Sequence, residues 1–131
     1  MVASSRNWRV IRVEDSSFPA FYRVVWTEHV AEFSSLTASA RAECMSVVCA
    51  IERVLIRLLR PTKVNLAALG NIVPHLHWHV IARFDWDSHF PQPIWGEAQR
   101  HVDSAAALLA VSLAELDREV ADAVGDARSD D

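Results

Sequence analysis

Cysteine is scarce in this sequence, with only Cys44 and Cys49 among 131 residues. The two lie in a segment that has the pattern of a helix, where their spacing places the side chains on different faces, so we expect no disulfide between them. Disulfide frameworks are typical of small secreted domains, and the first ten residues, MVASSRNWRV, also lack the apolar core of a signal peptide. The sequence therefore predicts a cytoplasmic protein.

Long apolar runs and an excess of basic residues are missing as well. No run approaches the roughly 20 apolar residues that a membrane-spanning helix requires. Lysine and arginine total 13, against 17 aspartates and glutamates, which gives a formal net charge of −4. Proteins that coat nucleic acid or an anionic membrane depend on a basic surface, so we expect neither as a partner. Local basic groups could still bind a small anionic ligand.

The composition is that of an ordinary globular protein, with 51% hydrophobic and 23% charged residues. We find no internal repeat, and a chain of this length is sufficient for one hydrophobic core and too short for two domains. We therefore expect a single domain over residues 1–131. Residues 125–131 are polar and acidic, and the sequence predicts that they form a frayed tail.

Two strands and a long helix are predicted in the first half of the chain. The runs WRVIRVE (8–14) and FYRVVW (21–26) are rich in β-branched and aromatic residues and flank a turn-forming segment with Pro19, which is the pattern of an antiparallel pair. Residues 33–61 contain a helix with one buried stripe, and Pro61 ends it because proline cannot continue the hydrogen-bond ladder. The stripe consists of Cys44, Val47, Val48, Ile51, Val54, Leu55 and Leu58.

Two more strands, a loop and a second helix follow. KVNLAAL (63–69) and PHLHWHVIAR (74–83) have the pattern of strands separated by a glycine–asparagine break, and the segment 83–97 is predicted to be an ordered but irregular loop. Ser112 and Glu115 have the spacing of a capping box ahead of a shorter helix. This order of elements predicts an α+β fold with an antiparallel sheet, one long helix packed on it and a shorter C-terminal helix.

Three histidines alternate with apolar residues in PHLHWHVIAR. Side chains of a strand alternate between its two faces, so His75, His77 and His79 are predicted to line one face, with about 6.6 Å between neighbours. The apolar residues between them fill the opposite face, where the long helix can pack. The pattern therefore anchors the strand while presenting three imidazoles together.

We considered three interpretations of these imidazoles. Three partly buried histidines without a function are disfavoured, because histidine is uncommon in strands and a buried polar group without a partner costs free energy. Zinc ligands must lie about 2.1 Å from the ion, whereas the three positions span about 13 Å, so only two of them could bind without strain. In the third interpretation one imidazole attacks phosphorus while its neighbours orient it, bind phosphate oxygens and protonate the leaving group.

The sequence HLHWHVI (75–81) resembles the histidine triad (HIT) motif, His-φ-His-φ-His-φ-φ with φ apolar, at every position. The upstream VVWTEHVAEFSSLT (24–37) is similar to the strand, histidine and helix start of this family, and LGNIVPHLHWHVIAR (69–83) to its glycine, amide residue and triad strand. HFPQPIWG (89–96) is similar to bacterial histidine triad hydrolases. The resemblance covers about residues 8–96, and a match to both the triad and the upstream histidine is specific.

The resemblance implies a HIT-like fold and a nucleotide hydrolase or nucleotidyl transferase that acts at an α-phosphate. By position in the motif, His77 is the nucleophile that forms a nucleotidyl-histidine intermediate. His79 contacts the phosphate and the leaving group. His75 supports His77 through hydrogen bonds, and His29 matches the fourth histidine of the family, which supports His75.

Three further positions are implied in substrate binding. Asn71 matches a phosphate-contacting amide, Asn65 lies near a second polar contact, and Gly70 lets the backbone approach the phosphate. Two positions depart from the family pattern: Ile72 replaces a frequent serine or threonine, which removes a hydroxyl contact to phosphate, and Ala82 replaces a frequent proline. Neither touches the predicted nucleophile.

We therefore expect a homodimeric protein whose partner is a small nucleotide, either a nucleoside phosphoramidate or a dinucleoside polyphosphate, because cleavage of P–N and P–O bonds uses the same histidines. No cofactor or metal bound to the protein is expected, and a divalent ion carried by the substrate is compatible with this chemistry. Two alternatives stay open. One is a metal-dependent hydrolase with His75 and His77 as ligands, and the other is a non-catalytic nucleotide-binding module.

Overall fold

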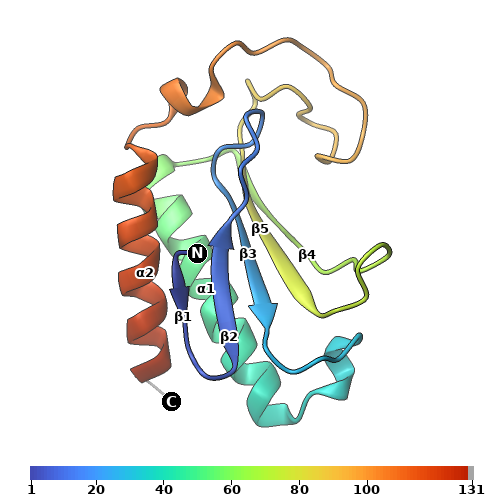
Figure 1. Cartoon of the computed structure of the whole chain (residues 1–131). Coiled ribbons are helices and arrows are strands. Elements are labelled where there is room, and N and C mark those ends of the chain that lie inside the picture. The colour runs from blue at the N-terminus through green and yellow to red at the C-terminus, as the bar shows by residue number, and fades with distance from the viewer. Residues whose placement is uncertain (130–131) are drawn as a thin grey trace.

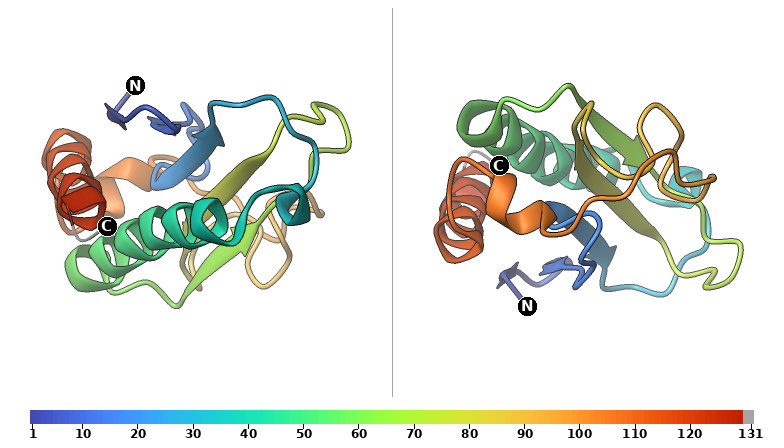
Figure 2. Two further views of the ribbon diagram at one scale, coloured as in Figure 1. Left: turned by 90° about the horizontal axis from the view of Figure 1, so that it is seen from below. Right: turned by 90° about the horizontal axis from the view of Figure 1, so that it is seen from above.

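The computed structural model describes residues 1–129 and contains one antiparallel sheet and two α-helices (Figure 1). The strand order in the sheet is β1-β2-β3-β5-β4. The helices lie side by side and contact each other (Figure 2). The predicted α+β fold is thus confirmed. The elements are β1 (Ala3–Ser4), β2 (Trp8–Arg12), β3 (Phe21–Trp26), α1 (Ala38–Leu59), β4 (Lys63–Ala67), β5 (His77–Arg83) and α2 (Leu113–Ser129), with short 3-10 helices at Phe33–Ser35 and Ala105–Leu108.

The long helix α1 begins and ends at the signals that the sequence contains. The Thr37 side chain accepts a hydrogen bond from the backbone N–H of Ala40 at the N-terminus, and Arg60 takes the left-handed conformation (φ 46°) just before Pro61. Cys44 is buried and Cys49 half-buried, and both are free thiols, as predicted. The buried stripe consists of Cys44, Val47, Val48, Ala50, Ile51, Val54, Leu55 and Leu59, whereas Leu58 is only half-buried.

The hydrophobic core lies between the sheet and the two helices. Alternate residues of β2, β3 and β5 face α1 and are almost completely buried, because side chains of a strand alternate between its faces. The remaining residues of these strands face the other side of the sheet and are available for a site. The core-facing residues of the three strands include Trp8, Val10, Tyr22, Val24, Val80 and Ala82.

The triad strand begins later than the sequence predicts. β5 starts at His77, not at Pro74, so His75 lies outside the strand. The reason is a local pairing: the Leu76 N–H donates to the Val30 carbonyl (2.8 Å), and the Trp26 N–H donates to the Leu76 carbonyl (3.1 Å). Residues 75–76 therefore follow the chain that leaves β3 and are held outside the regular ladder.

Other boundaries also differ from the predictions. The two-residue strand β1 was not predicted, and β2 ends at Arg12, short of residue 14. Helix α2 continues to Ser129, so residues 125–129 are helical where a frayed tail was predicted, and residues 130–131 of that tail lie outside the described part of the chain. The buried Val124 keeps the last turns packed on the core. None of the described helices is long and apolar enough to cross a membrane.

Candidate active site

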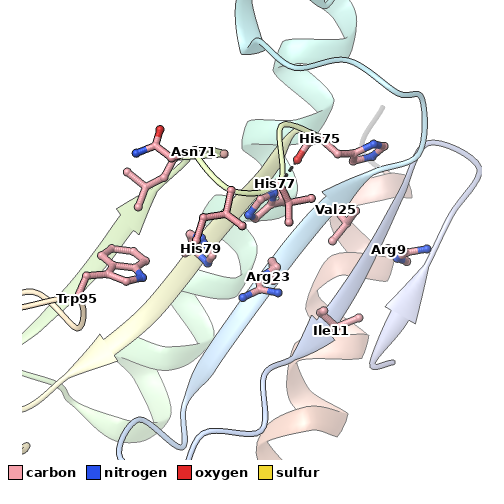
Figure 3. Close-up of a pocket in the computed structure, with 13 residues that line it drawn as sticks. Arg9, Ile11, Arg23, Val25, Asn71, His75, His77, His79 and Trp95 are labelled. Carbon is pink, nitrogen blue, oxygen red and sulfur yellow. Dashed lines mark hydrogen bonds between the residues drawn. The ribbon is translucent and has the colours of Figure 1, made fainter.

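The face of the sheet that points away from α1 carries a cavity of about 700 Å³ (Figure 3). Six side chains from β2, β3 and β5 form its floor. They lie in two rows across the strands, because residues paired in an antiparallel ladder share a face. The first row consists of Arg9, Val25 and His77, and the second of Ile11, Arg23 and His79.

A backbone contact fixes the His77 ring in the cavity. Its Nδ1 lies 2.6 Å from the carbonyl oxygen of His75. Because a carbonyl oxygen only accepts hydrogen bonds, Nδ1 must carry the hydrogen, and in the neutral ring Nε2 then carries the lone pair. Nε2 has no hydrogen-bond partner among the described residues. This nitrogen can therefore act as a nucleophile or a ligand toward a molecule in the cavity.

The His75 ring points away from the rings of His77 and His79 (Figure 3). Its Nε2 lies 2.5 Å from the Trp26 carbonyl oxygen, and its Nδ1 lies 2.8 Å from Nδ1 of His29. Nε2 must donate to the carbonyl, so Nδ1 of a neutral His75 accepts from the exposed His29. The structure thus places His29 beside His75 and connects His75 to His77 through a backbone carbonyl.

The third triad residue, His79, is buried to 6% exposure and surrounded by rings. The rings of Phe21, His77 and Trp95 lie edge-on to it, with centroids 5.0–5.4 Å away. Burial, followed by the charges of Arg23 and His77, lowers the pKa of His79 to about 4. Its Nδ1 is buried without a partner among the described residues. His79 is therefore neutral near pH 7 and has a free ring nitrogen.

The rim of the cavity includes the turn that precedes the triad. Gly70 has a φ of 71°, a left-handed conformation that favours glycine, and Asn71 is exposed beside it. Both residues line the cavity, together with the exposed Ile72. The structure therefore brings five of the implied residues, His75, His77, His79, Gly70 and Asn71, to one cavity.

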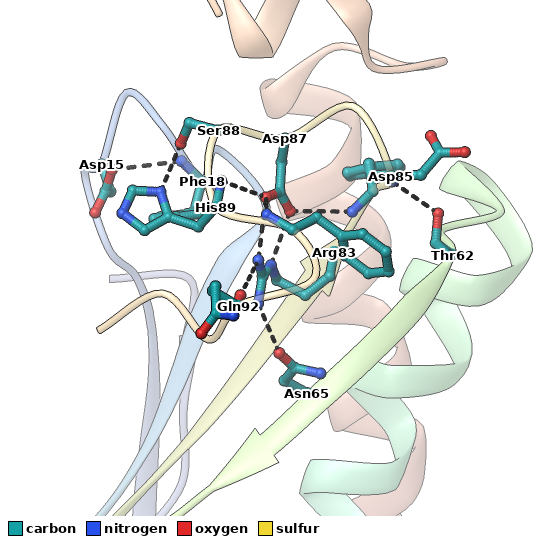
Figure 4. Close-up of polar contacts among 12 residues, drawn as sticks. Asp15, Phe18, Thr62, Asn65, Arg83, Asp85, Asp87, Ser88, His89 and Gln92 are labelled. Carbon is teal, nitrogen blue, oxygen red and sulfur yellow. Dashed lines mark hydrogen bonds and ion pairs between the residues drawn. The ribbon is translucent and has the colours of Figure 1, made fainter. Parts of the chain in front are cut away.

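Asn65 lies elsewhere. It is not among the residues that line the cavity, and its side-chain oxygen accepts a hydrogen bond from Arg83 (Figure 4). The Arg83 guanidinium is almost completely buried and forms two hydrogen bonds with Asp87, at 2.8 and 3.0 Å. A fourth hydrogen bond joins Arg83 to the Gln92 carbonyl. Asn65 therefore supports the start of the irregular loop after β5 and is not placed to contact a ligand over His77.

This loop, residues 84–104, is ordered by Asp87. The Asp87 carboxylate accepts hydrogen bonds from the backbone N–H groups of Phe84, His89 and Phe90 as well as from Arg83. Burial raises the pKa of Asp87, but these hydrogen bonds outweigh it and lower the pKa overall. The loop carries Trp95 to the cavity, where its ring lies edge-on to His79.

The directions of the ring nitrogens bear on the alternative in which His75 and His77 are metal ligands. Within the described residues, no group of three His, Cys, Asp or Glu side chains is placed to hold a metal ion. Both ring nitrogens of His75 are directed at other groups of the protein, and Nδ1 of His77 is directed at a carbonyl. As placed, the rings of His75 and His77, the ligand pair of the metal-dependent alternative, do not point toward a common position (Figure 3).

The sequence-based predictions missed the β2 and β3 residues of the floor. A signal for them was present: Arg9 in WRVIR and Arg23 in YRVVW alternate with residues that point into the core. The same alternation places Tyr22 on the core side of β3, where its hydroxyl donates a hydrogen bond to Asp117 at 2.6 Å. Phe18 and Phe21 form a small cluster with Ile81 outside the main core.

A family model described as HIT domain matches residues 1–86. No curated protein sequence matches this chain. Among solved structures, the chain is similar to a histidine triad protein from Bradyrhizobium japonicum (26% identity, TM-score 0.76, 94% of this chain and 88% of that chain covered). It is also similar to a histidine triad protein from Marinobacter aquaeolei VT8 (25% identity, TM-score 0.74, 95% and 88% covered). A zinc-bound histidine triad family protein from Mycobacterium smegmatis shares the fold (16% identity, TM-score 0.59, 99% and 86% covered).

Proposed function

This chain belongs to the histidine triad (HIT) family, and from that premise we propose that it cleaves a nucleotide at its α-phosphate through a covalent bond between phosphorus and His77. The substrate class is a dinucleoside polyphosphate or a nucleoside phosphoramidate. The product of the first step is a nucleotidyl-histidine, which water hydrolyses.

The observation that carries this proposal is the orientation of the His77 ring. The carbonyl of His75 holds Nδ1–H, so the lone pair on Nε2 is unoccupied within the described residues and belongs to a ring that lines the cavity. A nucleophile needs an available lone pair and a fixed direction of attack. A single 2.6 Å contact supplies both.

The reaction balances with this ring as the nucleophile. In the first step Nε2 of His77 forms a bond to phosphorus, and the bond from phosphorus to the leaving group breaks. The leaving group keeps the electron pair and takes up a proton. In the second step a water oxygen bonds to phosphorus, the P–N bond breaks, its electrons return to Nε2 and the water releases a proton.

Neighbouring groups would stabilise the charge on the phosphoryl oxygens. His79 is neutral near pH 7, because its pKa is about 4, and a neutral imidazole can donate one N–H to a phosphate oxygen. A bound phosphate would favour the protonated ring, since an opposite charge nearby raises the pKa of histidine. A proton for the leaving group would then arrive at His79 together with the substrate. The exposed Asn71 amide supplies a further donor at the rim.

The test compares hydrolysis by wild type, His77→Ala and the control His101→Ala, using a diadenosine polyphosphate and adenosine 5′-phosphoramidate. We expect His77→Ala to lower kcat/KM by about a thousandfold or more, since the nucleophile is lost. His101→Ala should keep wild-type activity, because His101 is exposed and contacts only Asp103.

Three results would contradict the proposal. Equal turnover by wild type and His77→Ala would remove His77 as the nucleophile. Stoichiometric protein-bound zinc whose removal abolishes activity would favour the metal-dependent alternative. Tight nucleotide binding by wild type without turnover of either substrate would favour a non-catalytic binding module.

A further inference from the structure

Arg23 lies in the centre of the cavity floor without a partner for its charge. It is paired with His79 across β3 and β5, and with Ile11 across β2 and β3. Its side chain is half-buried, and its Nε is completely buried without a hydrogen-bond partner among the described residues. In Figure 3 the guanidinium points toward the space in front of His77 and His79.

The surroundings of Arg23 contrast with those of the other partly or fully buried arginines. Arg12 is paired with Asp117 and Arg83 with Asp87, and the half-buried Arg41 donates a hydrogen bond to the Leu36 carbonyl, whereas no hydrogen bond satisfies Arg23 among the described residues. No aspartate or glutamate lines the cavity within the described residues. Burial lowers the pKa of Arg23, and no carboxylate offsets this. A desolvated charge without a counter-ion is destabilising, so its position is explained best by a ligand that brings the opposite charge.

A second arginine adds positive charge to the same floor. Arg9 and Arg23 occupy diagonal positions on β2 and β3, because Arg9 pairs with Val25, two residues along from Arg23. Diagonal positions lie about 7–8 Å apart between Cα atoms, which long side chains can bridge. Arg9 is exposed at the outer end of the row that contains His77, and it has no ion pair among the described residues.

We propose that Arg23, with Arg9 as an outer positive charge, forms an anion-binding subsite that takes the charged oxygens of a phosphate ester or anhydride. The planar fork of the guanidinium suits phosphate, to which it can donate two parallel hydrogen bonds. Two arginines on a floor without a carboxylate suit a ligand with two or more negative charges. This subsite rests on the function proposed above in one respect, namely that the bound phosphate lies over His77 and His79.

A purely structural role for Arg23 is the competing explanation. The guanidinium carbon lies 5.7 Å from the centre of the Phe21 ring, within the range of a cation–π contact. If that contact were its only purpose, the loss of the charge would affect the stability of the fold and would not discriminate between charged and neutral ligands. Ligand charge therefore separates the two explanations.

The experiment measures binding of AMP, inorganic phosphate and adenosine by isothermal titration calorimetry. The proteins are wild type, Arg23→Gln, Arg9→Gln and a matched control, Arg53→Gln, which removes one exposed positive charge from α1. We expect Arg23→Gln to weaken AMP and phosphate binding by about 10- to 100-fold, the loss of one charge-assisted hydrogen-bonding group. Adenosine affinity should change by less than about twofold, Arg9→Gln should have a smaller effect than Arg23→Gln, and Arg53→Gln should match wild type.

Arg23→Lys provides a second variant in case Arg23→Gln fails to fold, and we expect an AMP affinity between those of wild type and Arg23→Gln, because the charge is kept and the fork is lost. Unchanged AMP affinity in the Arg23 variants, an equal loss of adenosine affinity, or no binding of AMP or phosphate by wild type would overturn the inference. The two proposals fail separately. AMP binding that does not depend on Arg23, with an intact covalent adduct on His77, removes only the subsite, whereas AMP binding that depends on Arg23 without an adduct removes only the covalent mechanism.

Discussion

At the scale of single residues, the site depends on which ring nitrogen carries hydrogen. Two backbone carbonyls determine the tautomers. The His75 carbonyl requires hydrogen on Nδ1 of His77, and the Trp26 carbonyl requires hydrogen on Nε2 of His75. Both carbonyls belong to residues held by β3 or by the turn after it. The tautomers are thus set by the backbone, which is stiffer than a side chain, so the reactive lone pair is oriented before a ligand arrives.

His79 makes the stability of the protein depend on pH. Its pKa in the folded protein is about 4, below the ordinary value of 6.5, so between these two values the unfolded chain binds a proton that the folded protein does not. Stability then increases with pH across this window. We predict that the free energy of unfolding, measured by urea denaturation, falls on acidification from pH 6.5 to pH 4 and that the fall is smaller in His79→Gln. An identical slope in both proteins would refute this.

The lowered pKa of His79 can also be measured directly. Burial is the main cause of the low pKa, and Arg23 is the next. In Arg23→Gln the pKa of His79 should therefore rise, while staying below 6.5 because burial is retained. An NMR titration of the His79 ring resonances measures the change. If the pKa were unchanged, Arg23 would not be close enough to act on this ring.

The sequence was sufficient to find the triad and insufficient to find the arginines of the floor. His77 and His79 follow from their spacing, because alternation in a strand needs no knowledge of the rest of the chain. Arg9 and Arg23 obey the same alternation, but whether their face meets water or a cavity depends on the turn at 69–75 and on the loop after β5. Asn65 is the opposite case, because the sequence placed it near the ligand. In the structure it accepts a hydrogen bond from Arg83, whose position is fixed by the loop after β5.

At the scale of elements, the loop 84–104 contains no strand or helix, and hydrogen bonds to Asp87 order its first part. One carboxylate binds Arg83 and three backbone N–H groups, while Arg100 donates to the carbonyls of Asp87 and Phe90. The loop in turn holds Trp95 beside His79, at 5.4 Å between ring centroids. The wall of the cavity therefore depends on a buried ion pair.

Breaking that ion pair should destabilise the protein strongly. We predict that Asp87→Ala lowers the free energy of unfolding by about 3–5 kcal/mol, because Arg83 is left buried without its counter-ion. The double variant with Arg83→Ala should lose less than the sum of the two single losses, because the two side chains interact. The control is Arg57→Ala, which breaks the exposed pair with Glu119 and should cost no more than about 1 kcal/mol. Urea denaturation measures wild type and the four variants Asp87→Ala, Arg83→Ala, the double variant and Arg57→Ala, and a small loss in Asp87→Ala would contradict the role assigned to this carboxylate in the loop.

Elements were predictable where local signals agree. The stop at Pro61 and the cap at Ser112, which accepts a hydrogen bond from the Glu115 N–H, both lie where the sequence indicates. The start of β5 was wrong because it is set by hydrogen bonds to Val30 and Trp26, more than forty residues away in sequence. A local sequence pattern carries no information about hydrogen bonds between residues so far apart in the chain.

At the scale of the whole molecule, the site is assembled from segments that are distant in the chain. β2 and β3 supply the arginines, β5 the histidines, and the loop after β5 the tryptophan. Asp117 connects α2 to the sheet. Its carboxylate accepts hydrogen bonds from Arg12 of β2 and Tyr22 of β3, which lie about a hundred residues earlier in the chain. The antiparallel arrangement could be predicted from the order of elements, but the position of β5 between β3 and β4 could not, because strand neighbours depend on long-range packing.

The central claim is that the folded chain presents one imidazole nitrogen to an electrophilic phosphorus atom. The most direct measurement mixes the protein with an isotopically labelled adenylylated substrate, stops the reaction rapidly without acid, and analyses the peptide that contains residues 74–83 by mass spectrometry. We predict an adenylyl group on His77, which is absent from His77→Ala. Turnover by wild type without any label on this peptide, or with the label on another residue, would contradict the account.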